Sequence, residues 1–211
     1  MKILVTGGAG FIGSHIVEYL VQRGDDVTIL DNLHSGKMQN LSKINNDTNF
    51  VNGDIRDYEL LERLAKDSDG VFHQAALVSV PQSFKMQDEY FDVNTNGTEN
   101  ILKLAKEYGF KVVYASSSSV YGNQKQISIK ESDNRSPTNP YAQTKLKAEF
   151  LAEKYSEIGV RVIGLRYFNV YGRRQSKEYA GVIKLFLGRI QQKKAPKING
   201  DGLQTRDFVY V

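Results

Sequence analysis

The sequence predicts an α/β fold built on a doubly wound parallel sheet, and three observations support this prediction. Short apolar runs typical of strands alternate with amphipathic, helix-like segments along most of the chain. The first run, residues 2–6, leads straight into a glycine-rich loop, and an acidic residue, Asp31, ends the second run. Alternating strands and helices form parallel sheets covered by helices on both faces, and such sheets bind ligands beyond the carboxyl ends of their strands.

The expected elements follow one another in the order that such a sheet requires. The polar residues 32–49 are expected to form a loop. Asp57 is expected to cap the amino end of the helix at residues 58–66. The expected strands are residues 2–6, 27–30, 50–51, 70–76, 111–115 and 161–166. One helix is expected to begin near Phe11. The other helices are expected to cover residues 58–66, 88–108 and 141–158.

The alternation ends after Arg166. A loop, a helix at residues 179–192, a glycine-rich turn and a strand-like run at residues 207–211 follow. We therefore expect residues 1–168 to form a Rossmann-type domain. We expect residues 169–211 to begin a smaller C-terminal substrate domain that is incomplete in this chain.

Composition excludes several classes of function. The chain has 211 residues and a net charge of +4, and its basic residues are scattered, which argues against nucleic acid as a partner. The absence of cysteine excludes disulfides, thiolate metal sites and cysteine nucleophiles, and the three histidines show no metal-ligand spacing. No apolar run approaches the roughly 18 residues of a membrane span, and a strand expected at residue 2 is unlike a signal peptide. A cytoplasmic protein without metal is the expectation.

The glycine-rich loop indicates a dinucleotide site. Gly7, Gly8 and Gly10 are expected to let the backbone turn tightly and approach a pyrophosphate, and Gly13 to let the following helix pack closely. The amino end of that helix directs its N–H groups and positive dipole end at the phosphates. Asp31 can accept hydrogen bonds from the adenosine ribose and would repel a 2′-phosphate, which favours NAD over NADP. The alternative is a glycine-rich structural turn.

A second signal lies on the predicted helix at residues 141–158. Tyr141 and Lys145 are four residues apart and share a helix face, and a nearby ammonium group favours the phenolate and lowers the pKa of a tyrosine. Tyr141 is therefore a candidate general acid/base, although such pairs also occur by chance. The serines at 116–119 follow a strand and could hydrogen-bond a sugar oxygen, or form only a polar loop. His73, at a strand end, is expected to be a packed, hydrogen-bonded histidine.

These motifs together resemble the extended short-chain dehydrogenase/reductases. The motifs are the loop at residues 6–13, Ser116–Ser118, Tyr141-x-x-x-Lys145 and Arg166–Asn169. Within that group they are similar to the NAD-dependent nucleotide-sugar epimerases and dehydratases, typified by UDP-glucose 4-epimerase. The resemblance implies NAD as cofactor, a nucleotide sugar as substrate, epimerisation at C4 through a 4-keto sugar, and a homodimer as the assembly.

The resemblance also implies roles for particular residues. The implied catalytic residues are Ser117, Tyr141 and Lys145, and the implied substrate contacts are Ser117, Asn169 and Arg206. Pyrophosphate, ribose, adenine and nicotinamide contacts complete the set. The implied cofactor residues are Gly7, Gly10, Phe11, Ile12, Asp31, Asn32, Asp54, Ile55, Gln74, Ala75, Ala76, Leu77, Val78, Asn94 and Phe168.

The chain departs from the family pattern in two places within its length. Related 4,6-dehydratases carry an Asp-Glu pair directly after the catalytic hydroxyl, where this chain has Ser118 and Ser119, so dehydration is disfavoured. Some 4-epimerases carry a lysine where this chain has Val78. Two alternatives remain open: another nucleotide-sugar reaction, such as uronate epimerisation, decarboxylation or 4-keto reduction, and an NAD-binding module without turnover.

Overall fold

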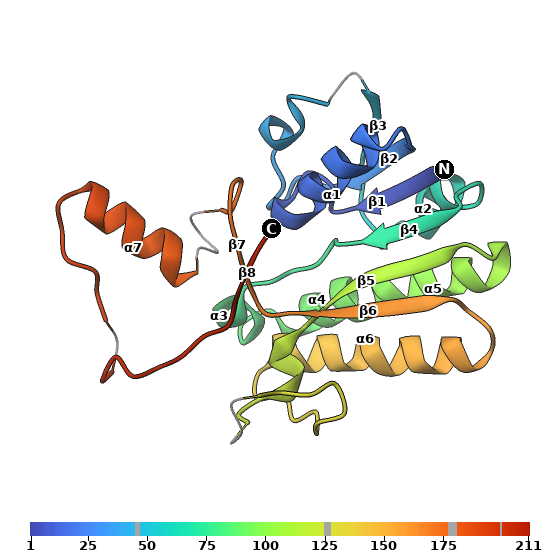
Figure 1. Ribbon diagram of the computed structural model, residues 1–211. Coiled ribbons are helices and arrows are strands. Elements are labelled where there is room, and N and C mark those ends of the chain that lie inside the picture. The colour runs from blue at the N-terminus through green and yellow to red at the C-terminus, as the bar shows by residue number, and fades with distance from the viewer. Residues whose placement is uncertain (45–46, 125–127, 177–180, 199) are drawn as a thin grey trace. The chain divides into compact units, whose positions relative to one another are not determined.

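The chain forms two compact units, Met1–Tyr167 and Phe168–Val211. The computed structural model, shown in Figure 1, describes residues 1–44, 47–124, 128–176, 181–198 and 200–211. The first unit contains most of the helices and strands, and the second contains one helix and a small sheet.

A six-stranded sheet forms the centre of the first unit. Its strands lie in the order β3-β2-β1-β4-β5-β6, and every pairing is parallel. This is the strand order of a doubly wound nucleotide-binding sheet, in which the crossovers change direction between β1 and β4. The predicted fold class is therefore confirmed. The strands are β1 (Lys2–Thr6), β2 (Asp26–Asp31), β3 (Thr48–Asn52), β4 (Gly70–His73), β5 (Lys111–Ser117) and β6 (Val162–Tyr167).

Helices cover both faces of this sheet. Alternate residues of β1 enter two hydrophobic clusters: Ile3 and Val5 pack with helix α1, whereas Leu4 packs with α2, α5 and α6. The helices, traced in Figure 1, are α1 (Phe11–Gln22), α2 (Tyr58–Ala65), α3 (Val80–Ser83), α4 (Gln87–Phe91), α5 (Gly97–Tyr108) and α6 (Pro140–Glu157). Two 3₁₀ turns, Met38–Leu41 and Ser118–Tyr121, lie in segments for which no helix was predicted.

The helix predicted at residues 88–108 is not regular along its length. A wide π turn, Asp92–Asn96, separates α4 from α5. The turn contains two buried polar side chains, Asn94 and Thr95, and both contact α6. Asn94 Nδ2 donates to Thr144 Oγ1, and Thr95 Oγ1 donates to the Thr144 carbonyl. Turns of this kind often occur at functional sites.

The amino end of α2 confirms the predicted cap and carries a first testable expectation. Asp57 Oδ1 accepts a hydrogen bond of 3.0 Å from the Leu60 N–H, which satisfies one unpaired donor of the first turn. Asp57→Ala is expected to lower the free energy of unfolding by about 1 kcal/mol in urea titrations. Asp57→Asn keeps an oxygen acceptor and should change the free energy of unfolding by about a few tenths of a kcal/mol at most. Equal losses in both variants would contradict the cap.

The second unit contains a two-stranded parallel sheet and one helix. Strand β7 (Asn169–Tyr171) pairs with β8 (Phe208–Tyr210), with Asn169 opposite Phe208. The sequence predicted only a loop at β7, because a strand of three residues is too short to show periodicity. Helix α7 (Val182–Gln191) begins later than the predicted residue 179, and residues 179–180 lie outside the described part of the chain. Among the described residues, no helix combines the length and apolar character needed to cross a membrane.

Candidate active site

The glycine loop joins β1 to α1 at the carboxyl edge of the sheet. Gly7 has a φ of +69°, and a Cβ there would lie 2.6 Å from the backbone nitrogen of Ala75. Gly10 caps α1 without a side-chain hydrogen bond, and the first turn holds no acidic residue. The amino end of this helix therefore has no side-chain acceptor of its own, so the loop fits an anionic group such as a pyrophosphate.

Two other glycines of the loop serve packing. A Cβ on Gly8 would lie 2.7 Å from Ile29 on β2 and 3.2 Å from Val17 on α1, so Gly8 allows the helix to pack on the sheet. That Gly8 also lets the backbone approach a pyrophosphate stays a prediction. A Cβ on Gly13 would overlap the carbonyl oxygen of Gly7, which agrees with the close packing predicted for the start of the helix.

Asp31 ends β2 beside the glycine loop. Its Oδ2 accepts a hydrogen bond of 2.9 Å from the Ala9 N–H, and its Oδ1 accepts one of 2.8 Å from the Leu33 N–H. The residue is only 7% exposed, and burial raises the pKa of its carboxyl group. Gly36 lies so close that a Cβ there would be 2.7 Å from Oδ1. Asp31 thus fixes the glycine loop, and its bond to a ribose stays a prediction.

The structure brings together the residues predicted at the adenosine end. Asn32 Nδ2 donates to Asp54 Oδ2 over 3.0 Å. Arg56 donates to both oxygens of the same carboxylate, over 2.8 and 2.9 Å, and holds the pKa of Asp54 at about 2. Ile55, between them in sequence, is buried. Arg56 was not predicted; its signal is only its place two residues after Asp54.

The segment after β4 also lies against the glycine loop. The Gln74 N–H donates to the carbonyl of Thr6 over 3.0 Å, and the Ala75 N–H approaches Thr6 Oγ1 at 3.4 Å. Gln74 Oε1 accepts a hydrogen bond from the Tyr167 hydroxyl, whereas its buried Nε2 has no partner among the described residues. A buried donor without an acceptor is uncommon in folded proteins, and this one is available to a ligand. Ala76 and Leu77 are half-buried and Val78 is exposed.

Asn94 holds this segment in place. Its Oδ1 accepts from the Leu77 N–H over 2.8 Å, and its Nδ2 donates to the Leu77 carbonyl over 3.0 Å and to Thr144 Oγ1 over 3.1 Å. Both ends of the buried amide are therefore used within the protein. The predicted cofactor contact of Asn94 stays a prediction, and the structure shows in addition that it fixes the backbone of Leu77.

The three predicted catalytic residues lie together at the carboxyl end of β5. Tyr141 is in the first turn of α6, whose amino end is capped by Asn139, and Ser117 lies close enough to act on the pKa of its phenol. Lys145, one turn further along, has its Nζ 6.0 Å from the centre of the Tyr141 ring and donates to the Ala115 carbonyl over 2.9 Å. A phenol, a hydroxyl and an ammonium group thus converge where ligands of such sheets bind.

The predicted effect of Lys145 on Tyr141 is wrong for this structure. Burial raises the pKa of Tyr141, and only the hydrogen bond with Ser117 acts to lower it. Lys145 is itself 4% exposed, and burial lowers its pKa to about 8. Helix spacing predicted a shared face correctly but carried no information about burial, which outweighs the charge at this distance.

His73 is confirmed as a packed, hydrogen-bonded histidine. Its Nδ1 lies 2.7 Å from Thr6 Oγ1 and its Nε2 lies 3.0 Å from Thr98 Oγ1. Burial, and secondarily the charge of Lys145, lower the pKa of His73 to about 3. The imidazole is therefore neutral and joins β1, β4 and α5.

The buried imidazole makes stability depend on pH in a defined window. Below pH 6.5 the unfolded chain protonates His73, whereas the folded chain does so only near pH 3. His73 should therefore lower the free energy of unfolding by about 1.4 kcal/mol per pH unit as pH falls through this range. Urea titrations at several pH values should show a shallower slope for His73→Gln than for the unmodified chain. The exposed His34→Gln is the control, and equal slopes for all three proteins would contradict this expectation.

The remaining predicted residues belong to the second unit. Asn169 opens β7, and its Nδ2 donates to the Asp207 carbonyl over 2.8 Å. Arg206 directly precedes Asp207 and is exposed. The two predicted substrate residues therefore lie side by side at one end of this small sheet. Phe168 precedes Asn169 and is half-buried.

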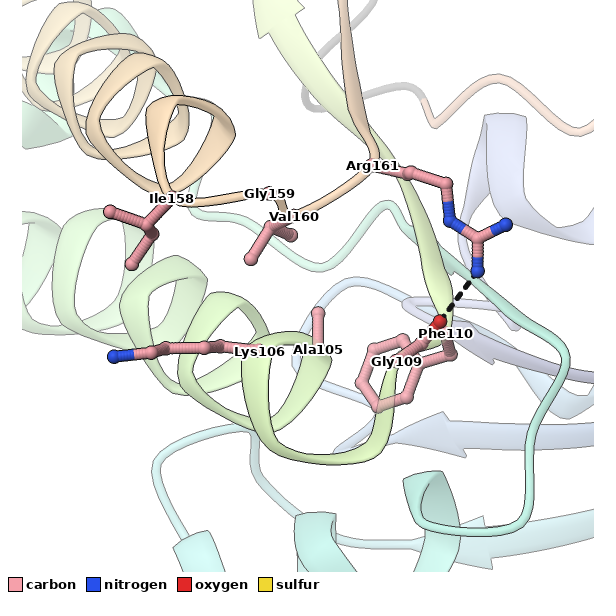
Figure 2. A pocket seen from close by; sticks show the side chains of 8 residues that line it. All are labelled: Ala105, Lys106, Gly109, Phe110, Ile158, Gly159, Val160 and Arg161. Atoms are coloured by element: carbon pink, nitrogen blue, oxygen red, sulfur yellow. Dashed lines mark hydrogen bonds between the residues drawn. The ribbon is translucent and has the colours of Figure 1, made fainter.

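A small hollow of about 90 Å³ lies at the amino ends of β5 and β6. Figure 2 shows the side chains around it and the hydrogen bond of 2.7 Å from Arg161 Nη2 to the Gly109 carbonyl. A dinucleotide needs several hundred Å³, and the predicted site residues of the first unit lie at the opposite ends of the strands. This hollow is therefore not the cofactor site.

The fold and the site together define a dinucleotide-binding protein of the short-chain dehydrogenase/reductase fold. The chain belongs to the NAD dependent epimerase/dehydratase family, whose model matches residues 3–211. NAD is therefore its cofactor, and the uncapped amino end of α1 and the unpaired Gln74 amide fit such a ligand.

Three relatives show the range of the family. A solved UDP-N-acetylglucosamine 4-epimerase from Methanobrevibacter ruminantium, in complex with UDP-N-acetylmuramic acid, superposes with a TM-score of 0.94 at 42% identity, covering 99% of this chain and 68% of that one. A UDP-glucose 4-epimerase of Halalkalibacterium halodurans is 40% identical over all of this chain and 67% of its own length. A UDP-N-acetyl-alpha-D-glucosaminuronate decarboxylase of Bacillus cytotoxicus is 39% identical over the same shares. The chain spans about two thirds of the length of these relatives.

Proposed function

We propose that this chain carries the catalytic centre of a nucleotide-sugar 4-epimerase that interconverts UDP-glucose and UDP-galactose. The observation that carries the proposal is the convergence of Ser117, at the end of β5, with Tyr141 and Lys145 on the first turns of α6, where Lys145 Nζ lies 6.0 Å from the centre of the Tyr141 ring. The similarity to two 4-epimerases, at 42% and 40% identity, supports it.

The three side chains have separable tasks. Ser117 Oγ holds the C4 hydroxyl of the sugar, and Tyr141 as phenolate removes its proton. NAD, when bound, would supply the acceptor and the donor of the C4 hydride. Tyr141 then gives the proton back to the C4 oxygen. Lys145, fixed by the Ala115 carbonyl with its Nζ 6.0 Å from the centre of the Tyr141 ring, is assigned the nicotinamide ribose.

Because Tyr141 acts as a phenolate in this reaction, its pKa must be lowered by its surroundings during catalysis. Burial raises that pKa in this structure, so the phenol must be deprotonated after the positively charged nicotinamide and the substrate complete the site. The positive charge of an oxidised nicotinamide, when bound near the phenol, would favour the phenolate. Turnover is therefore expected to depend on the oxidised form of the cofactor.

A second candidate reaction is decarboxylation of a nucleotide uronic acid. It is favoured by the 39% identity to a UDP-N-acetyl-alpha-D-glucosaminuronate decarboxylase, because both reactions begin with oxidation at C4. Ser118 and Ser119 lack the acidic groups that dehydration at C5 and C6 needs, so a dehydratase is disfavoured.

The reaction class can be tested before any specific substrate is fixed. The NAD-loaded chain is mixed separately with UDP-glucose and UDP-glucuronate, and the near-ultraviolet absorbance of reduced NAD is followed together with the mass of the sugar product. Epimerisation predicts a transient signal with UDP-glucose and a product of unchanged mass. Loss of CO₂ from UDP-glucuronate, with no signal from UDP-glucose, would replace the epimerase by the decarboxylase.

A further inference from the structure

Helix α6 is tied to the end of β5 on three successive turns. Tyr141 lies close enough to Ser117 for the serine to act on the pKa of the phenol, and Lys145 Nζ donates to the Ala115 carbonyl over 2.9 Å. Four residues further along the helix, Glu149 Oε1 accepts a hydrogen bond of 2.5 Å from Ser116 Oγ. The proposed reaction uses the first two contacts and leaves the third without a task.

Glu149 is a buried carboxylate that accepts hydrogen bonds from three side chains. It is 5% exposed, and Arg166 Nε and Nη2 each donate to one of its oxygens over 2.9 Å. Arg135 Nη1 adds a bond of 3.1 Å, and its second partner is Glu153, one turn further along α6. Together with Ser116, these donors join α6 to β5, to β6 and to the segment that precedes α6.

Arg166 extends this network to the other side of the catalytic serine. Its Nη1 donates to the Tyr121 hydroxyl over 2.7 Å and to the Glu131 carbonyl over 2.9 Å. Ser116 directly precedes Ser117 in sequence. The 3₁₀ turn that begins directly after Ser117 ends at Tyr121. The network therefore fixes the backbone on both sides of Ser117 as well as the helix that carries Tyr141.

The energetics of buried ion pairs favour a role in positioning. Burying two charged groups costs several kcal/mol of desolvation, and a well-packed apolar replacement is often equally stable. Apolar contacts, such as that of Ala152 with its core cluster, do not specify where along its axis a helix sits. A shift by one residue moves a helix by about 1.5 Å, which would carry the Tyr141 hydroxyl away from Ser117.

We infer that Glu149 is a positioning residue, which, through Ser116 and Arg166, sets the position of α6 on β5 at which the Tyr141 hydroxyl meets Ser117. The inference rests on the proposed function, because it assigns to Glu149 the alignment of that acid/base pair. Glu149 touches neither substrate nor cofactor in this account.

The test uses Ser116→Ala and Glu149→Gln in the full chain. Their primary readout is the titration of Tyr141, followed by NMR of labelled tyrosine Cζ and assigned by the signal lost in Tyr141→Phe. The neighbouring titratable groups, Lys145 on α6 and His73 on β4, are unchanged in both variants. Moving Tyr141 away from Ser117 removes the interaction that lowers the pKa of Tyr141, so the midpoint of its titration should rise.

The same variants should separate kcat from KM. A misaligned acid/base pair lowers kcat by about tenfold while KM and the affinity for NAD stay within twofold. Ser68→Ala is the matched control, because it removes a serine hydroxyl that donates to the Leu64 carbonyl. Ser68 lies shortly before the amino end of β4, whereas the site lies at the carboxyl ends of the strands. Its Tyr141 titration and its kcat should equal those of the unmodified chain.

One result overturns the inference. If Ser116→Ala or Glu149→Gln lowers the melting temperature while the Tyr141 titration stays unchanged, Glu149 only stabilises the fold. Ser116→Ala removes a single neutral donor, so it decides the question even where Glu149→Gln does not fold. The titration needs no substrate, so an absence of turnover with nucleotide sugars would contradict the proposed function and leave this test standing.

Discussion

Tyr141→Phe is expected to lower turnover of a nucleotide sugar by about a thousandfold, which is within the usual range for loss of a general acid/base. The substitution keeps the ring and removes only the phenol hydroxyl, on whose pKa Ser117 acts. The affinity for NAD should therefore be retained, and the loss should appear in kcat. Steady-state kinetics with UDP-glucose, together with a separate measurement of NAD binding, checks both parts.

The same helix supplies a matched control for this substitution. Tyr155 is half-buried on α6 and packs against a core cluster at some distance from the site. Tyr155→Phe should leave kcat within about twofold of the unmodified value. Turnover retained in Tyr141→Phe, or lost equally in both variants, would remove Tyr141 from the mechanism.

Gly7→Ala is expected to abolish NAD binding and to lower the free energy of unfolding by about 3 kcal/mol or more. The φ of +69° is unfavourable for alanine, and the added Cβ would lie 2.6 Å from the nitrogen and 2.8 Å from the Cα of Ala75. These are backbone atoms that cannot rotate away, so the loop or the segment after β4 must move. Isothermal titration with NAD and urea unfolding measure the two effects.

Gly24→Ala separates backbone strain from this collision. Gly24 has a φ of +85°, and a Cβ there would meet no atom within 4 Å. Gly24→Ala should lower the free energy of unfolding by only about 1 kcal/mol, which is the cost of the left-handed backbone for alanine. This variant should bind NAD normally. If Gly24→Ala proves as harmful as Gly7→Ala, strain alone explains the loss and the close approach of the loop to Ala75 has no separate role.

The sheet and the glycine loop were predictable because their signals are local. The residues at 2–6 and the glycines that follow form one continuous pattern, and Asp31 ends the next strand. The parallel sheet with helices on both faces followed from the alternation of strands and helices. The spacing of Tyr141 and Lys145 likewise predicted that they share a helix face.

The rest of the site depends on contacts between residues far apart in sequence. Glu149 meets Ser116 and Arg166 because α6 crosses the ends of β5 and β6, and no spacing along the chain reveals that meeting. The pKa of Tyr141 was predicted with the wrong sign for a related reason. Burial is a property of the packed structure, and at this site it outweighs the charge of Lys145.

The central claim is that this chain uses NAD and Tyr141 to invert C4 of a UDP-hexose. The most direct measurement incubates the NAD-bound chain with UDP-glucose and, separately, with UDP-galactose, and follows the anomeric signals of both sugars by NMR. Both incubations should reach the same mixture of the two sugars, and Tyr141→Phe should stop the conversion. No conversion from either side, with NAD shown to be bound, would contradict the central claim.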